Sequence, residues 1–131
     1  MFVCTIGPDG RGQYISAGHN PGYIYRAADG TIDELPSTNL ILGAFDFATF
    51  DATPIEVRPG DVVLAYSDGL TEAESAHEEM FGEDRVKEIF RREASSGAVR
   101  VHDALIASIA EFTRGHDQSD DITLVIAEMR S

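Results

Sequence analysis

Short apolar runs separated by turn residues dominate the first half of the chain. Each run is rich in β-branched or aromatic residues and is bounded by Gly, Pro, Asn or Asp, which is typical of β-strands. The predicted strands are Phe2 to Ile6, Gln13 to Ser16, Tyr23 to Ala27, Thr31 to Leu35, Ile55 to Val57 and Val62 to Tyr66. Turns at Gly18 to Gly22 and at Asp29-Gly30 predict a meander of the second to fourth strands, and Pro59-Gly60 predicts a hairpin of the last two.

The second half carries two helical patterns and one more strand. Gly82 to Ala94 repeats apolar residues at i, i+3 and i+4, with acids near its amino end and arginines near its carboxyl end, as the helix macrodipole favours. Val101 to Phe112 carries a second apolar stripe, and Gly115 is predicted to cap it. Ile122 to Ala127 is a β-branched run that we expect to pair antiparallel with Asp61 to Ala65.

One long stretch, Pro36 to Thr53, has no regular pattern of apolar and polar positions. Its three phenylalanines, Phe45, Phe47 and Phe50, are scattered rather than periodic. We therefore predict a long loop that is packed by its own aromatic side chains.

Acidic residues stand where two of the apolar runs meet turns. Asp68 follows Val62 to Tyr66, and Asp120-Asp121 precede Ile122 to Ala127, so antiparallel pairing of the two runs would bring the acids together. Carboxylate oxygens are the ligands that Mg²⁺ and Mn²⁺ prefer. Each motif also has a simpler explanation when it is considered alone. Asp68-Gly69 is typical of a turn, and an acidic pair at the start of a strand can protect a sheet edge against aggregation.

Composition restricts the classes of function. At 131 residues and 43% hydrophobic residues, the chain is predicted to be one domain, residues 1–131. It has no apolar run near the roughly 20 residues that cross a bilayer and no leader pattern. A net charge of −13 argues against nucleic acid and anionic membranes as partners. The single cysteine, Cys4, indicates a reducing compartment, so we expect the cytoplasm.

Three motifs carry a family resemblance. Ala17-Gly18-His19-Asn20-Pro21, the segment Tyr66 to Ala73 (YSDGLTEA) and the segment Ser119 to Thr123 (SDDIT) occur in this order. Together they resemble the bacterial sporulation-stage-II-E-like, regulator-of-sigma-B type branch of the PPM metal-dependent protein serine/threonine phosphatases. The resemblance covers almost the whole chain.

The resemblance implies an α+β fold, a PPM phosphatase-like β-sandwich of antiparallel sheets flanked by helices. The family's earlier acidic motifs, which supply the ligand bridging two metals, have no counterpart here, so the chain resembles the C-terminal half of the domain with the N-terminal half absent. Missing strands would expose sheet edges, and we expect a homodimer through them.

The resemblance also implies a chemistry. The complete domain holds two ions, Mn²⁺ or Mg²⁺, and a metal-bound water attacks the phosphoserine of an anti-anti-sigma-type protein, so no side chain acts as nucleophile. Asp68 and Asp120 match the family's two late metal ligands. Because neighbouring strand residues face opposite ways, Asp121 is expected beside the site rather than on the metal. Gly69 is expected either to let the backbone approach closely at the site or to serve as a turn residue.

His19 and Asn20 are expected next to the site. The imidazole of His19 either orients substrate or a metal-bound water, or holds its loop through hydrogen bonds to backbone. With only part of the ligand set, the isolated chain is expected to be inactive or feeble. The alternatives are a catalytically silent phosphatase-like interaction module in bacterial signalling, and a β-rich binding domain whose motifs match by accident.

Overall fold

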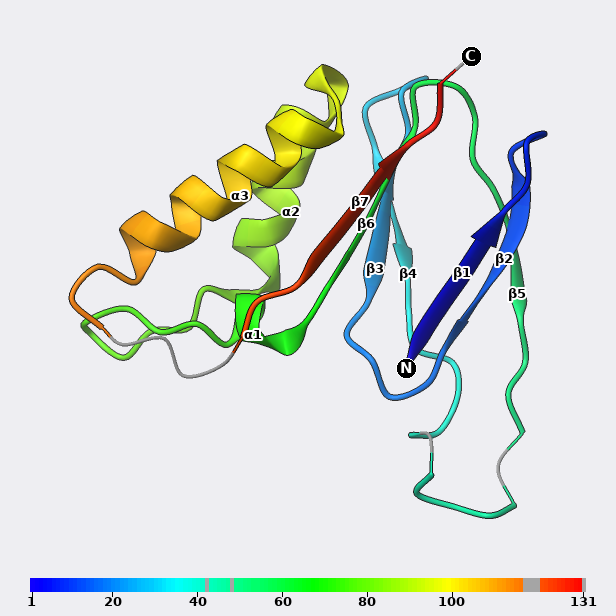
Figure 1. The fold of residues 1–131 in the computed structure, drawn as a ribbon, viewed down its shortest axis with the longest axis horizontal. Coiled ribbons are helices and arrows are strands. Elements are labelled where there is room, and N and C mark those ends of the chain that lie inside the picture. Colours follow the sequence, from blue (N-terminus) through cyan, green and yellow to red (C-terminus); the bar gives the residue numbers. More distant parts are fainter. Residues whose placement is uncertain (42, 48, 117–120, 131) are drawn as a thin grey trace.

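The computed structural model describes residues 1–41, 43–47, 49–116 and 121–130. Two antiparallel sheets and a helical layer make up the fold (Figure 1). The elements are β1 (Phe2–Ile6), β2 (Arg11–Ser16), β3 (Gly22–Tyr25), β4 (Ile32–Leu35), β5 (Thr53–Glu56), β6 (Val62–Tyr66), α1 (Asp68–Thr71), α2 (Gly82–Glu93), the 3-10 helix η1 (Ala94–Ser96), α3 (Ala98–Phe112) and β7 (Leu124–Glu128). Within the described ranges, no helix is long and apolar enough to cross a membrane.

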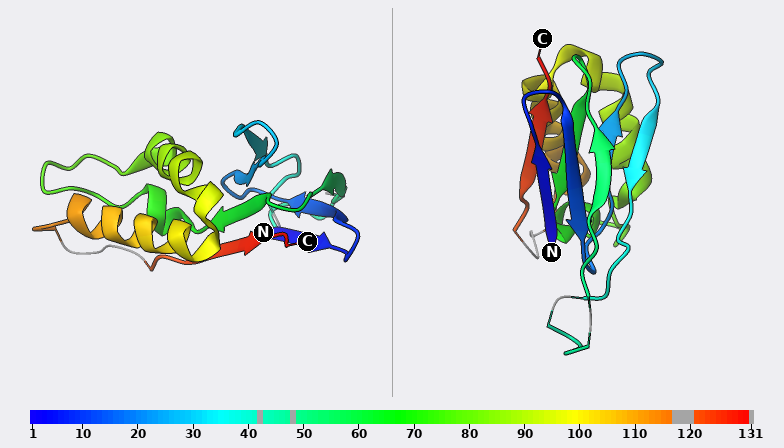
Figure 2. Two further views of the ribbon diagram at one scale, coloured as in Figure 1. Left: turned by 90° about the horizontal axis from the view of Figure 1, so that it is seen from above. Right: turned by 90° about the vertical axis from the view of Figure 1, so that its right-hand side faces the viewer.

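The three layers stack in the order helices, four-stranded sheet, three-stranded sheet (Figures 1 and 2). The four-stranded sheet has the order β4-β3-β6-β7, and the three-stranded sheet has the order β1-β2-β5. Helices α2 and α3 cover the outer face of the four-stranded sheet, where Phe90, Val101 and Leu105 are fully buried. A second, smaller core lies between the sheets around Tyr14 and Ile24.

The predicted pairing of the two acid-flanked strands is confirmed. β6 pairs antiparallel with β7, from Val62 opposite Glu128 to Tyr66 opposite Leu124. The end of β6 therefore meets the beginning of β7, as the functional argument requires.

The predicted hairpin of Ile55 to Val57 with Val62 to Tyr66 is wrong. Strand β5 pairs with β2, with Ile55 opposite Gly12, whereas β6 pairs with β3 and β7 in the other sheet. The turn between β5 and β6 carries the chain from one sheet to the other, because Val57 donates its backbone N–H to the carbonyl of Gly10. For the same reason only the β3–β4 part of the predicted meander holds, since β2 and β3 belong to different sheets.

Two local expectations are also corrected. The aromatic side chains do not pack the long loop, because Phe45 and Phe47 contact each other and remain 49% and 71% exposed. Helix α3 ends at Phe112, before Gly115, because Thr113 caps it and donates both its N–H and its hydroxyl to the carbonyl of Ile109.

A buried carboxylate ties the β5–β6 turn to the four-stranded sheet. Asp61 is 3% exposed and accepts hydrogen bonds from the backbone N–H groups of Arg58 and Ala27 and from the guanidinium of Arg26, at 2.9 to 3.0 Å. Burial alone would raise the pKa of Asp61, but these hydrogen bonds outweigh it and lower that pKa below its ordinary value. The carboxylate thus stabilises the fold in its charged form.

We predict that Asp61→Asn lowers the free energy of unfolding by roughly 3 kcal/mol near pH 7, because it breaks a buried charge pair. A carboxylate with a depressed folded-state pKa contributes stability above its unfolded pKa and loses it as the pH falls through the folded value. Urea unfolding of the wild type should therefore show a loss of stability in acid that is weaker in the variant. Asp51→Asn, whose side chain is exposed, is the control, and equal pH profiles for wild type and Asp61→Asn would contradict the prediction.

Candidate metal-binding site

Asp68 stands where buried strand β6 gives way to the short helix α1. Its backbone carbonyl accepts the N–H of Glu72 and the hydroxyl of Thr71, whereas its side chain is exposed to solvent. The last four positions of β6, Val63 to Tyr66, are buried or half-buried, so the carboxylate is held just beyond the end of a firmly packed strand.

Ser67 joins this strand end to the beginning of β7. Its N–H donates to the carbonyl of Thr123 at 2.9 Å, and its hydroxyl accepts the N–H of Thr123 at 2.9 Å. The hydroxyl also donates to the carbonyl of Asp121 at 3.3 Å. Ser67 is not among the site residues predicted from the sequence, although its position directly before Asp68 in the YSDG motif was a usable signal.

Gly69 brings the two segments into direct backbone contact. A Cβ atom at this position would overlap the carbonyl oxygen of Asp121, so any side chain would push the segments apart. Because Gly69 lies buried inside α1, its role in the structure is close approach rather than the turn that Asp-Gly also suggested.

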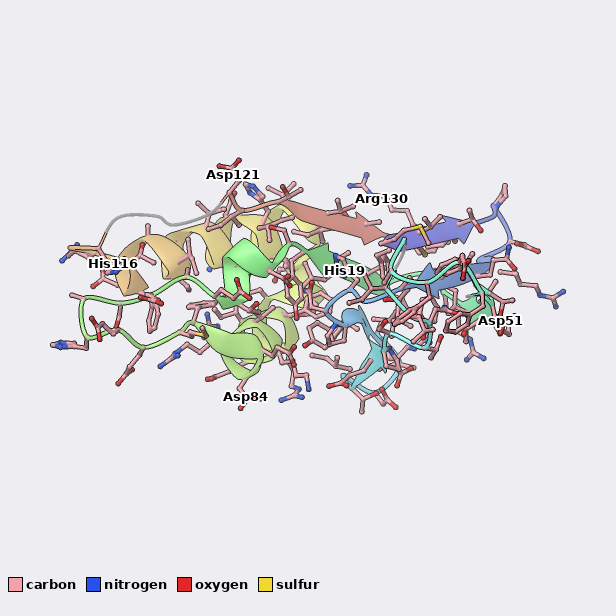
Figure 3. The ribbon with its side chains drawn as sticks, turned by 90° about the horizontal axis from the view of Figure 1, so that it is seen from below. His19, Asp51, Asp84, His116, Asp121 and Arg130 are labelled. Carbon is pink, nitrogen blue, oxygen red and sulfur yellow. The ribbon has the colours of Figure 1, made fainter. Side chains whose placement is uncertain are left out.

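Asp121 lies at the entry to β7, and its exposed side chain points outward, away from His19 (Figure 3). Asp120, the other predicted carboxylate of the motif, lies outside the described residues. The structure therefore joins the two acidic motifs through Ser67, Gly69 and Asp121.

The AGHNP loop reaches the same strand end. Asn20 donates its side-chain N–H to the carbonyl of Tyr66 at 3.0 Å, two residues before Asp68. The ring Nδ1 of His19 lies 2.7 Å from the carbonyl oxygen of Asn20, and the ring packs against Phe2. These contacts correspond to the loop-holding role of His19. The side-chain oxygen of Asn20 is buried and has no hydrogen-bond partner among the described residues.

Comparison with known proteins decides the family. The model of the family "Stage II sporulation protein E (SpoIIE)" matches residues 1–130. This chain belongs to the SpoIIE family. The resemblance drawn from its three motifs is therefore confirmed.

Curated relatives of this SpoIIE-family chain include two bacterial proteins. Protein IcfG of Synechocystis is 31% identical over 117 residues, which are 89% of this chain and 18% of that protein. Phosphoserine phosphatase RsbU of Bacillus subtilis is 30% identical over 119 residues, which are 86% of this chain and 33% of that protein. The chain thus spans a third or less of the length of these relatives.

Solved structures show the fold of the SpoIIE family directly. The SiaA-PP2C domain of Pseudomonas aeruginosa matches with a TM-score of 0.75 and 25% identity, over 92% of this chain and 47% of that one. The phosphatase domain of SpoIIE from B. subtilis matches with a TM-score of 0.74 and 18% identity, over 99% and 56%. The predicted class is confirmed: antiparallel sheets with helices that make up about half of a PPM-type phosphatase domain.

The carboxylates of this SpoIIE-family chain suit part of a site for a hard divalent cation. The carboxylate of Asp68 is exposed at a fixed strand end. Carboxylate oxygens are the ligands that Mg²⁺ and Mn²⁺ prefer. Within the described ranges, no three His, Cys, Asp or Glu residues lie close enough together to hold a metal ion. A cation bound at Asp68 would therefore take its further ligands from outside these ranges.

We predict that Gly69→Ala lowers stability by about 1–3 kcal/mol, because the added methyl group overpacks against the backbone of Asp121. Thermal unfolding measures the loss. Gly7→Ala is the control, since its methyl group would mainly meet a flexible carboxylate oxygen of Asp9, at 3.1 Å. A Gly69→Ala variant as stable as the control would show that the segments do not approach this closely.

Proposed function

We propose that this chain is the metal-binding C-terminal half of a cytoplasmic, metal-dependent serine/threonine phosphoprotein phosphatase. The observation that carries the proposal is the set of hydrogen bonds by which Ser67 joins the Asp68 turn to the segment of Asp121 and Thr123. Two motifs that are more than fifty residues apart in the chain thereby meet at one strand end, and both contain carboxylates.

Asp68 and Asp120 are the residues that we assign to the metal, which is Mn²⁺ or Mg²⁺. The chemistry that such cations supply when bound is neutralisation of phosphate oxygens and activation of the attacking water. The need for cations follows from charge, because a chain of net charge −13 repels a phosphate monoester. No side chain of this chain is assigned as nucleophile.

The remaining residues of the site hold these carboxylates in place. Gly69 lets the backbone of Asp121 approach, and Ser67 fixes the distance between the two segments. Asn20 anchors the end of β6 through Tyr66. Each of these contacts acts on backbone near a proposed ligand, so the chain itself holds the strand end that carries Asp68.

A phosphoserine of an anti-anti-sigma-type protein is the substrate that we propose. The relative RsbU is a phosphoserine phosphatase, and one matching solved structure contains the RsbU and RsbW domains of Rv1364c from Mycobacterium tuberculosis, at 26% identity and a TM-score of 0.73. The exposed position of Asp68 suits a phosphorylated residue presented on a protein surface, because nothing in the described structure encloses that carboxylate.

We predict that Asp68→Asn weakens Mn²⁺ binding about 100-fold or more, because it removes a ligand charge without changing volume. Calorimetric titration of the chain with Mn²⁺ measures this loss. Asp84→Asn is the matched control, since Asp84 is also exposed and lies on α2, across the molecule from Asp121 (Figure 3). Asp120→Asn should behave like Asp68→Asn, and Asp121→Asn like the control.

Other outcomes of this titration would distinguish the ligand assignments from each other and the phosphatase from the silent interaction module. If Asp121→Asn abolished binding and Asp120→Asn did not, the two assignments would be reversed. A wild-type chain that bound no Mn²⁺ would favour the silent interaction module. Binding that Asp68→Asn left unchanged would contradict the site itself.

We further predict that the isolated chain self-associates through β1 and β7, the edge strands of the two sheets. Sedimentation velocity between about 1 and 100 µM should show a shift from monomer to dimer. The wild-type chain at high salt is the control, because screening of its net charge of −13 should favour the dimer. A clean monomer at every concentration would rule out the edge contact.

A further inference from the structure

The long loop between β4 and β5 exposes an apolar surface. This β4–β5 loop comprises residues 36–52, of which 42 and 48 lie outside the described residues. Four of its large apolar side chains are between 46% and 71% exposed, namely Leu40, Ile41, Phe45 and Phe47. The rings of Phe45 and Phe47 contact each other, with their centroids 5.2 Å apart. Such a concentration on one loop differs from the isolated apolar side chains that any protein surface carries.

The β4–β5 loop is tied at its base. The side-chain nitrogen of Asn39 donates to the carbonyl of Ser16 at 3.1 Å and to the carbonyl of Asp51 at 3.3 Å. The side-chain oxygen of Asn39 accepts the N–H of Asp51 at 3.0 Å. One amide thus joins both ends of the loop to each other and to the end of β2. A closed base reduces the conformational entropy that the loop loses when a partner binds its apolar side chains.

The base of the loop also contacts the AGHNP motif. Gly18 donates its N–H to the hydroxyl of Ser37 at 2.8 Å, and a Cβ atom at Gly18 would overlap the side chain of Ile41. The same motif reaches the end of β6, because Asn20 donates to the carbonyl of the last residue of that strand. The loop and α1, which begins with Asp68, lie at the same end of the sandwich (Figures 1 and 2). A protein that binds the loop therefore also faces the proposed metal site.

The strands that the loop connects are not those that line the apolar groove of the sandwich. β4 and β5 are edge strands, and each lies at the opposite edge of its sheet from β7 and β1, respectively. The groove is lined by side chains of β1, β6 and β7 and by residues next to them, none of which belongs to the loop. A segment that covers the groove therefore approaches the sandwich from the other side.

Charge selects the kind of partner that fits the loop. No Lys or Arg occurs between Arg26 and Arg58. The acidic residues of the same stretch are Asp29, Asp33, Glu34, Asp46, Asp51 and Glu56. Asp46 is exposed and stands between the two phenylalanines of the ring pair. An apolar surface with acidic residues around it complements an apolar surface surrounded by Lys or Arg. Anionic lipid headgroups, or a second copy with its net charge of −13, would be repelled.

We propose that the β4–β5 loop is the docking surface for the folded protein substrate, and that it binds an apolar patch surrounded by Lys or Arg on that protein. The inference rests on the proposed function for the identity of the partner, whereas the contact itself requires neither metal nor phosphate. Phe45 and Phe47 are the anchors, because aromatic rings bury a large apolar area with few rotatable bonds. Asp46 pairs with the basic residues of the partner. The loop thus selects the protein, and the metal site acts on its phosphoserine.

The test measures binding between this chain and purified anti-anti-sigma-type proteins from the genome that encodes it. These proteins are used without phosphate and in the presence of a metal chelator, so the Asp68 site contributes nothing to the measured affinity. Biolayer interferometry gives the Kd of the wild type, Phe45→Ser and Phe47→Ser. Val99→Ser is the matched apolar control, since Val99 is 73% exposed and lies on α3.

We expect at least one of these proteins to bind the wild-type chain. Phe45→Ser and Phe47→Ser should each weaken that binding at least about tenfold, because each removes an anchor, and Val99→Ser should leave the Kd unchanged. Asp46→Asn should weaken binding at low salt and less so at high salt, where the charges are screened, whereas Asp84→Asn on α2 should not. The Tm of each variant should stay within about 2 °C of the wild type, because the replaced side chains are exposed.

Equal Kd values for Phe47→Ser and Val99→Ser would overturn the proposal, and so would a failure of every protein to bind. Binding to vesicles of phosphatidylcholine and phosphatidylglycerol that Phe47→Ser abolishes would overturn it in favour of a membrane surface. Self-association that Phe47→Ser abolishes would overturn it in favour of a second copy.

Failure of the proposed function would look different from failure of docking. Loop-dependent binding by a wild-type chain that takes up no Mn²⁺ would support the docking surface and contradict the metal site. Uptake of Mn²⁺ that depends on Asp68, without binding of any of these proteins, would contradict the docking surface and leave the metal site in place.

Discussion

The pairing of β6 with β7 is the constraint on which the rest of the structure depends. It places Tyr66 opposite Leu124, so the residue after one strand and the residues before the other must share one strand end. Ser67 uses its N–H and its hydroxyl to continue the ladder by one more position, to Thr123. With β6 buried on both faces, neither segment can shift without breaking this ladder, because slipping by one residue would turn apolar side chains to the wrong face.

Charge links this geometry to function. A net charge of −13 makes the chain a poor receptor for any phosphorylated group by itself, and the carboxylates at the strand end add to the repulsion. In the proposed function, the same carboxylates act only when cations lie between them and an anionic substrate. The acidic strand end lies beside an apolar groove whose lining, among the described residues of β1, β6 and β7 and their neighbours, includes no Asp, Glu, Lys or Arg.

The sequence predicted what depends on local pattern and failed where distant contacts decide. β1 matches its predicted bounds, and α2 matches to within one residue, because alternation, helical periodicity and turn residues are local signals. The false hairpin of β5 with β6 had an equally good local signal. What overrode it was the bond from Val57 to Gly10 and the burial of Asp61 against Arg26 and Ala27, and neither Arg26 nor Ala27 is near Asp61 in sequence. Likewise, the motif marked Asp68, but only the structure shows why Gly69 must be glycine.

An apolar groove lies beside the proposed metal site. The groove opens between the edges of the two sheets and is lined by apolar side chains of β1, β6 and β7, among them Phe2, Val63 and Val125. Burying apolar surface of this kind contributes roughly 25 cal/mol per Å², so a segment that covers the groove gains binding energy without using the acidic residues. Because Ser67 and Thr123 belong both to the groove and to the support of Asp68, that energy also orders the strand end which carries the proposed ligand.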